Sequence, residues 1–342
     1  YRDLPVGVEL PIQSILPLAA GGVVYASRDG SFGIINARDE TRLLSPKVIP
    51  IYAANEKGLL ISPDGAAVQF AYERGGKGPA IFAVPERQLT DTASNLWAGL
   101  KAGLTFQAPI TDGLDISDWE TSLNPKLKGR PLQLNQEVAK CLAIKSDLTG
   151  FLIGTTHALR LFDPVGKILW QVRMPGVVWG VNTSGRVALA ALGDGTIRWY
   201  RISDGEEALA LFPHPDRRRW ILWTPSGYYD ASPGGEDFIG WHVNSGREQA
   251  ADFFPASRFR STYYRPDVID RVIKTLDEKE AFRMANVDAG RTPKAEASVI
   301  EKLPPVVSIT APADETQVSA TALKLRYSAR SREPLTRLKV LV

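Results

Sequence analysis

The sequence contains little of several residue types on which catalytic and metal sites depend. Of its 342 residues, one is a cysteine and three are histidines. A single cysteine excludes an intrachain disulfide framework and a cysteine-rich metal site. Cys141 lies in the apolar stretch 138–144, which predicts a small buried side chain and not a nucleophile. A chain without disulfides fits the cytoplasm and is also compatible with the periplasm.

Long hydrophobic runs and a strong net charge are also absent. No apolar run approaches the ~20 residues that a membrane-spanning helix needs, so we expect no membrane span. A formal net charge of +3 is small for this length and does not favour a nucleic-acid partner. The sequence begins at Tyr1 without a methionine or a leader, and we expect that it starts partway through a longer protein or follows a removed segment. Localisation is therefore unknown from the sequence.

A repeat runs through the first two-thirds of the chain. Each copy has a Gly-containing turn, an alternating strand, a second turn and an aromatic-rich strand. The average spacing of about 41 residues is that of a four-stranded propeller blade. The end of the aromatic-rich strand aligns at six positions: Ile35, Ala83, Trp119, Phe162, Tyr200 and Trp241.

The turns of the repeat support an all-β fold. Residues 28–35 read RDGSFGII, residues 193–200 read GDGTIRWY and residues 234–241 read GGEDFIGW. Gly and Asn recur at these places because tight hairpin turns need a positive φ. The region lacks helical segments long enough for a parallel α/β sheet. We therefore predict an all-β region, residues 1–255, that forms a β-propeller.

Residues 194–205 resemble a WD40 repeat closely, and the other copies resemble it more loosely. The Gly-His pair of that family is missing, and its Trp-Asp pair is degenerate. Residues 1–10 are similar to residues 200–209, which predicts that the chain opens in the middle of a blade. Either this strand closes the ring, or whole blades lie upstream. Six copies and this remnant favour seven blades, with six as the alternative.

The pattern changes after residue 255. Arg265-Pro266-Asp267 precedes apolar residues at helical spacing, and a second helix is predicted around 278–287. These helices and a linker form a predicted segment 256–303. The stretch 304–312, a strand at 323–327 and another at 338–342 predict the beginning of an immunoglobulin-like sandwich, residues 304–342. Three strands cannot complete such a core, so we expect that the chain stops inside this domain.

Three consecutive motifs carry a more specific resemblance. Residues 220–235, 239–244 and 264–269 are similar to bacterial WD40-repeat proteins that continue into a caspase-like peptidase domain. The resemblance runs from about residue 220 to residue 342. In that family the catalytic His and Cys belong to the peptidase domain, and no segment here matches them. The resemblance therefore implies an architecture and no catalytic residue.

Two aromatic features are candidate sites. Residues 162–170 resemble the tryptophan-docking repeat of quinoprotein dehydrogenases, but the motif occurs once and favours a structural Trp170. Tyr228, Tyr229 and Asp230 form an unusual cluster that fits either a recognition surface or packing between blades. The sequence predicts no catalytic residue, metal site or cofactor. On the propeller face that carries the Asp-Gly turns we expect further binding residues: Arg28, Asp29, Asp112, Asp194, Arg217 and Arg219.

The sequence thus favours a non-catalytic scaffold that binds protein partners. Its expected context is the sensing or regulatory part of a caspase-like protease. One alternative is a quinoprotein-type propeller enzyme, which would need a quinone and a metal. Another is a propeller subunit of a larger complex. The sequence does not identify the partner or reveal whether a peptidase domain follows.

Overall fold

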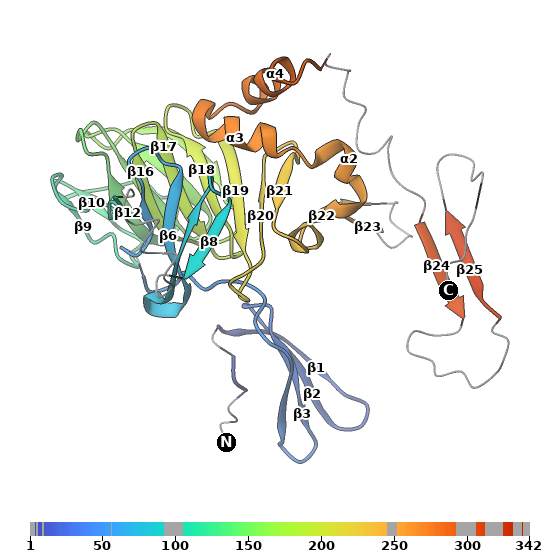
Figure 1. Cartoon of the computed structure of the whole chain (residues 1–342). Helices are drawn as coiled ribbons and strands as arrows, with labels where there is room; N and C mark the ends of the chain where they lie inside the picture. The colour runs from blue at the N-terminus through green and yellow to red at the C-terminus, as the bar shows by residue number, and fades with distance from the viewer. Residues whose placement is uncertain are drawn as a thin grey trace.

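The computed structural model of the chain is built mainly of antiparallel β-sheets, with a short helical region towards the C-terminal end (Figure 1). The all-β prediction is confirmed for the sheet region. None of the described helices is long and apolar enough to cross a membrane. The structure describes residues 4, 6–8, 10–55, 57–91, 105–244, 252–291, 306–311, 324–330 and 337.

The four largest sheets of the described residues are meanders in which consecutive strands pair. The first contains β1 (Ile12–Pro17), β2 (Gly22–Ser27), β3 (Phe32–Asn36) and β4 (Thr41–Ser45). The second contains β5 (Leu60–Ile61), β6 (Ala67–Glu73), β7 (Lys77–Ala83) and β8 (Gln88–Asp91). The third contains β12 (Ala139–Ile144), β13 (Phe151–Thr155), β14 (Ala158–Phe162) and β15 (Ile168–Arg173). The fourth has six strands: β16 (Val178–Ser184), β17 (Val187–Leu192), β18 (Ile197–Arg201), β19 (Glu207–Pro213), β20 (Trp220–Trp223) and β21 (Tyr229–Ala231).

Three of these sheets share an irregularity near the start of their first strand, which supports their being copies of one structural unit. The first strand of the β1–β4, β12–β15 and β16–β21 sheets shifts register near its beginning, at Ser14, Cys141 and Gly180. The pairing of the third with the fourth strand also shifts in each sheet, towards the end of the third strand in β14 and β18 and at its start in β3. Such bulges bend a strand and increase its twist. The repeat in the sequence therefore corresponds to a repeat in backbone geometry.

Four of the six aligned positions lie in the third strand of a four-stranded unit: Ile35, Ala83, Phe162 and Tyr200. The other two do not, and the prediction is wrong there. Trp119 lies between two strands of a small sheet formed by β9 (Ile116–Ser117), β10 (Lys126–Leu127) and β11 (Arg130–Pro131). Trp241 lies in β22 (Gly240–Val243), which pairs only with β23 (Asp252–Pro255) among the described strands.

Both exceptions have a local cause. In the third copy Pro125 precedes β10 and Pro131 lies in β11, and each removes a backbone donor beside a strand of two residues. In the sixth copy a tight turn, closed by the His214 N–H donating to the Arg219 carbonyl at 2.9 Å, returns β20 directly along β19. The sixth copy therefore extends the sheet of the fifth. The number of blades and closure of a ring stay predictions.

The β16–β21 sheet lies between two other sheets. Ala188, Ala190 and Tyr200 pack in one core with residues of the β12–β15 sheet. Leu189 and Trp199 face the other way and pack with residues of the β5–β8 sheet. The small β9–β11 sheet packs on the β12–β15 sheet through a third core. Neighbouring residues of one strand thus enter different cores, because side chains alternate between the faces of a strand.

The helical region packs on this assembly and does not form a core of its own. It contains α2 (Arg260–Tyr263), α3 (Pro266–Thr275) and α4 (Glu278–Asp288). The helix predicted at Pro266 begins at that residue, and its apolar face, which includes Val268 and Val272, shares the core of β19 and β21. The helix predicted around 278–287 is confirmed as α4.

Of the predicted immunoglobulin-like unit, the structure describes β24 (Val306–Ala311) and β25 (Arg326–Arg330), an antiparallel pair. The predicted linker lies mostly outside the described residues, and so does the strand predicted at 338–342. An immunoglobulin-like identity stays a prediction.

Candidate binding pocket

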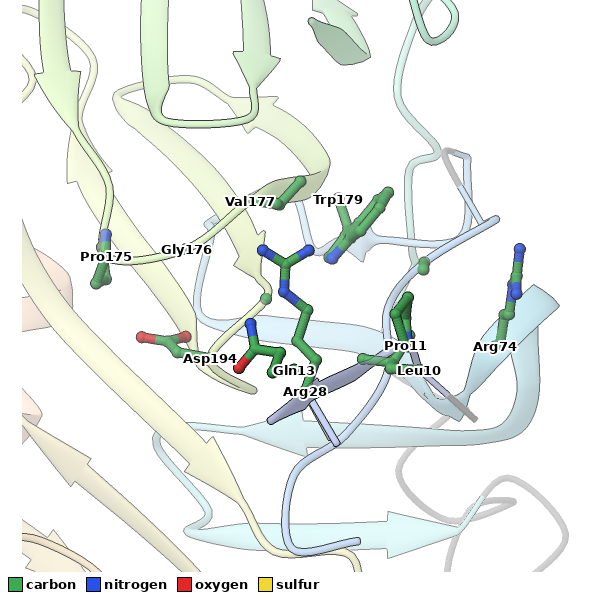
Figure 2. A pocket seen from close by; sticks show the side chains of 12 residues that line it. Leu10, Pro11, Gln13, Arg28, Arg74, Pro175, Gly176, Val177, Trp179 and Asp194 are labelled. Atoms are coloured by element: carbon green, nitrogen blue, oxygen red, sulfur yellow. The ribbon is translucent and has the colours of Figure 1, made fainter. Parts of the chain in front are cut away.

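A cavity of about 440 Å³ opens where three sheets meet (Figure 2). It lies beside the start of β1, the start of β16, and the turns β2–β3, β6–β7 and β17–β18. Its volume is within the range of pockets that bind small ligands. The lining comprises Leu10, Pro11, Gln13, Arg28, Ala53, Arg74, Pro175, Gly176, Val177, Trp179, Gly193 and Asp194.

Two of the turns at the cavity are built in the same way. The Asp29 carboxylate accepts hydrogen bonds from the backbone N–H and the hydroxyl of Ser31, and that of Asp194 accepts the equivalent bonds from Thr196, at 2.9 and 2.6 Å. The glycines that follow, Gly30 and Gly195, have φ of 80° and 84°. These values are strained for residues with a Cβ. The two predicted aspartates therefore hold the turns in shape.

Two cations of the cavity have no charged partner among the residues that the structure describes. Arg28 and Arg74 are both exposed, and within the described residues neither guanidinium makes an ion pair or a side-chain hydrogen bond. The carboxylate in the lining, Asp194, is already bonded to Thr196 and lies 3.2 Å from the Arg198 guanidinium. The described lining therefore presents an excess of positive charge.

The opposite wall is apolar and aromatic. Figure 2 shows Arg28 extending from its turn towards the wall that holds Val177 and Trp179. Trp179 is half-buried, and the Lys140 ammonium lies 5.4 Å from the centroid of its ring. This distance permits a cation–π interaction. The cavity thus combines cations with a large aromatic surface.

Of the nine predicted binding residues, Arg28 and Asp194 line this cavity and Asp29 supports it from the turn beneath Arg28. Asp112 is exposed in the loop before β9 and does not line the cavity. Arg217 and Arg219 lie in the β19–β20 turn and are engaged there. Arg217 pairs with Glu73 at 3.0 Å, and Arg219 pairs with Asp216 at 2.6 Å.

Tyr228, Tyr229 and Asp230 are buried beneath the helical region. The Tyr228 ring stacks on Phe282 of α4, with ring centroids 5.1 Å apart. The Tyr229 hydroxyl bonds with the Ala256 carbonyl at 3.2 Å, and burial raises the pKa of this hydroxyl well above its usual range. These residues attach the helices to β21, so we leave them out of the binding surface.

Asp230 belongs to an ion-pair cluster that joins two sheets to a helix. It pairs with Arg87, which also bonds to Asp270 of α3 at 2.8 Å. Burial alone would lower the pKa of Arg87, but the hydrogen bonds to both carboxylates raise it above its ordinary value. Asp230 therefore helps to connect β21 to α3 through Arg87, which is a structural role.

The other candidate residues have packing roles. Cys141 is buried, and the Trp170 indole N–H donates to the Ile202 carbonyl at 2.8 Å, which ties the β12–β15 sheet to the β16–β21 sheet. His214 stacks on Phe238 with centroids 4.4 Å apart. The described part of the chain contains no group of three His, Cys, Asp or Glu residues placed to hold a metal ion.

The sequence reasoning missed Arg74 and Trp179. Arg74 precedes Gly75-Gly76 in the β6–β7 turn, the position that Arg28 and its Asp-Gly turn occupy in the β1–β4 sheet. Arg74 could have been found by comparing, in all copies of the repeat, the turn that joins the second strand to the third. Trp179 gave no such signal, because a tryptophan in a strand is usually a core residue.

Comparisons with known proteins do not identify a family. No family model matches the chain, and no curated protein matches it. Among the solved structures, a crystal structure of the computationally designed Ika8 protein is 12% identical and aligns over 64% of this chain and 85% of its own, with a TM-score of 0.25. A similarity this low carries no argument about fold or function.

Proposed function

We propose that this chain is a non-catalytic protein-interaction scaffold built on a WD40-like β-propeller, and that it binds a peptide segment of its partner in the cavity lined by Arg28, Arg74 and Trp179. The cavity is the observation that carries this proposal. Aromatic and arginine side chains dominate the energetics of protein interfaces. Here both types surround one opening. Arg28 belongs to a turn held by the buried hydrogen bond from the Ser31 N–H to the Asp29 carboxylate, and Trp179 lies in β16.

The repeated sheet unit supports the propeller component. Three sheets share their bulges, and the β16–β21 sheet packs face to face with neighbours on both sides. Loops at one end of such a rigid stack vary without disturbing the core, which makes that end a natural binding surface. The resemblance of residues 220–342 extends the proposal to a context: the regulatory part of a caspase-like protease, or a subunit of a larger complex.

The chemistry of the lining favours binding over catalysis. Among the described lining residues, Asp194 is the one carboxylate, and it is occupied by Thr196 and Arg198. Arginine stays protonated at all ordinary pH values. The lining therefore lacks two side chains poised to exchange a proton with a substrate near neutral pH.

The test is to select a displayed library of random dodecapeptides on the purified chain and to map the bound peptides by amide hydrogen exchange. We expect slower exchange at Val177, Trp179 and Gly193 when a selected peptide is present. The turn between β14 and β15 is an internal control and is expected to be unchanged. If no peptide is enriched, or if protection appears only elsewhere, the proposal is wrong.

A further inference from the structure

We infer that the ligand of this cavity is an acidic peptide segment, with one carboxylate on Arg28, an apolar side chain against Val177 and Trp179, and a second carboxylate within reach of Arg74. This inference rests on the proposed function and adds the chemical class of the ligand. It begins from the charge balance of the lining. Two guanidiniums there lack partners among the described residues, whereas the carboxylate of Asp194 is paired.

An unpaired guanidinium favours a carboxylate for geometric reasons. Arginine presents parallel N–H donors that match the two oxygens of a carboxylate, and such charge-assisted bonds are stronger than neutral ones. Lys140 adds a third positive charge next to Trp179. A cationic ligand would be repelled by all three groups, and the paired Asp194 offers it little in return.

The rest of the lining favours a peptide over a simple inorganic anion. Pro11, Pro175, Val177 and Trp179 supply apolar surface beside the charges. An anion without apolar groups would leave this surface exposed to water, whereas a peptide with acidic and apolar residues in alternation would cover it. The ligand class is therefore set by the combination of cations and apolar wall.

The position of Arg28 is prepared before binding. Its backbone N–H donates to the Pro11 carbonyl at 3.1 Å, which joins the β2–β3 turn to the start of β1. Across the cavity, the Gly193 N–H donates to the Val177 carbonyl at 2.7 Å. Both walls are thus held by backbone hydrogen bonds, and binding needs to order only the side chains. This lowers the entropic cost of binding.

The test compares selections of the same dodecapeptide library on the wild-type chain and on three variants, Arg28→Gln, Arg74→Gln and Arg38→Gln. Arg38 is the matched control, since it is exposed in the β3–β4 turn, at the other end of the same sheet. We expect the wild type and R38Q to enrich peptides rich in Asp and Glu, and R28Q to lose this enrichment. Calorimetry with the most enriched peptide should show affinity weakened about tenfold by R28Q and about threefold by R74Q.

Each alternative outcome has a definite meaning. If the selected peptides lack acidic residues, or if they bind R28Q and R38Q equally well, the inference is overturned while the peptide-binding scaffold stands. If no peptide is enriched, the proposed function itself fails. A single-stranded dT12 oligonucleotide is added as a competitor. If it displaces the peptide and its own affinity depends on Arg28, the cavity is a nucleic-acid site and the peptide assignment is wrong. Circular dichroism of each variant verifies that it is folded.

Discussion

The β1–β4 and β16–β21 sheets share one backbone plan and differ in what surrounds them. Both have a bulge near the start of the first strand and an Asp-Gly turn between the second and third strands. In the β16–β21 sheet, Leu189 and Trp199 are fully buried. In the β1–β4 sheet, which extends away from the other sheets in Figure 1, Ile15 is 59% and Leu16 is 63% exposed.

This difference separates local from long-range determinants of the fold. Turn chemistry and strand alternation form the same unit in both places, with or without covering sheets. Both faces of the β1–β4 sheet carry exposed apolar side chains, since Ile15 and Leu43 lie on one face and Leu16 and Phe32 on the other. Apolar surface on both faces is characteristic of a sheet that packs between two neighbours. Of these two sheets, the β16–β21 sheet has such neighbours on both faces among the described residues.

The largest expected effect concerns one substitution at two corresponding leucines. Leu209 and Leu43 both occupy the third position of a fourth strand, and they are 0% and 43% exposed. Leu209→Ala should lower the free energy of unfolding by about 3 kcal/mol, because it removes a fully packed side chain. Leu43→Ala should lower it by less than about 1 kcal/mol. Urea unfolding of both variants measures the difference. Equal losses of stability would show that the two leucines are equally buried in the folded protein.

A smaller effect is expected from an ion pair inside the packed stack. Arg160 is fully buried and pairs with Glu137 at 2.9 Å. Partial burial alone would raise the pKa of Glu137, but hydrogen bonds from Arg160 and Thr155 lower it below its ordinary value. A carboxylate with a lowered pKa contributes stability above its unfolded-state pKa, and this contribution is lost as the pH falls through the folded-state pKa.

Glu137→Gln should therefore cost about 2 kcal/mol at pH 7 and much less at about pH 3. The control is Glu40→Gln, because Glu40 bonds to Asn36 in an exposed turn of the β1–β4 sheet. It should change stability by less than about 0.5 kcal/mol at either pH. Urea unfolding across this pH range measures both variants. A Glu137 effect that does not depend on pH would contradict the role assigned to this pair.

The shared turns should respond alike in the two sheets. Gly30→Ala and Gly195→Ala place a Cβ at φ of 80° and 84°, and each should cost about 1 kcal/mol or more. The new Cβ would also approach Val48 to 2.6 Å or Ile49 to 2.8 Å, so a neighbour must shift in both turns. Thermal unfolding of both variants measures these losses. Gly185→Ala is the control, because Gly185 also has a positive φ but a Cβ there would have no neighbour within 4 Å. Very different losses would mean that the two turns are not equivalent.

The smallest change in stability is expected on the exposed faces of the β1–β4 sheet. Leu16→Lys should alter the free energy of unfolding by less than about 0.5 kcal/mol, because the side chain is largely in water already. It should nevertheless reduce binding of a hydrophobic fluorescent dye and retard aggregation. The exposed Arg38→Gln variant should leave dye binding unchanged. A large loss of stability in Leu16→Lys would show that this face is covered in the folded protein.

Part of the candidate site could be predicted from the sequence. The Asp-Gly turns pointed to Arg28 and Asp194, because turn residues are recognisable from local sequence and lie at the ends of strands. Tyr228 and Tyr229 could not be assigned in the same way. Their sequence is equally compatible with exposure and with burial, and the helices that cover them begin about thirty residues later in the chain. Arg217 likewise is paired with Glu73, a residue far away in sequence.

The sequence by itself determined the units of this protein: antiparallel strands joined by Asp-Gly turns, and helices that begin at Pro266 and near Glu278. These features depend on φ preferences and side-chain periodicity over a few residues. Only the tertiary structure decided that the sixth copy joins the sheet of the fifth, and that Arg28, Arg74 and Trp179 surround one cavity. Those outcomes depend on which apolar faces meet. The hydrophobic effect that brings faces together is non-directional, and so it leaves no short-range pattern that identifies the partner.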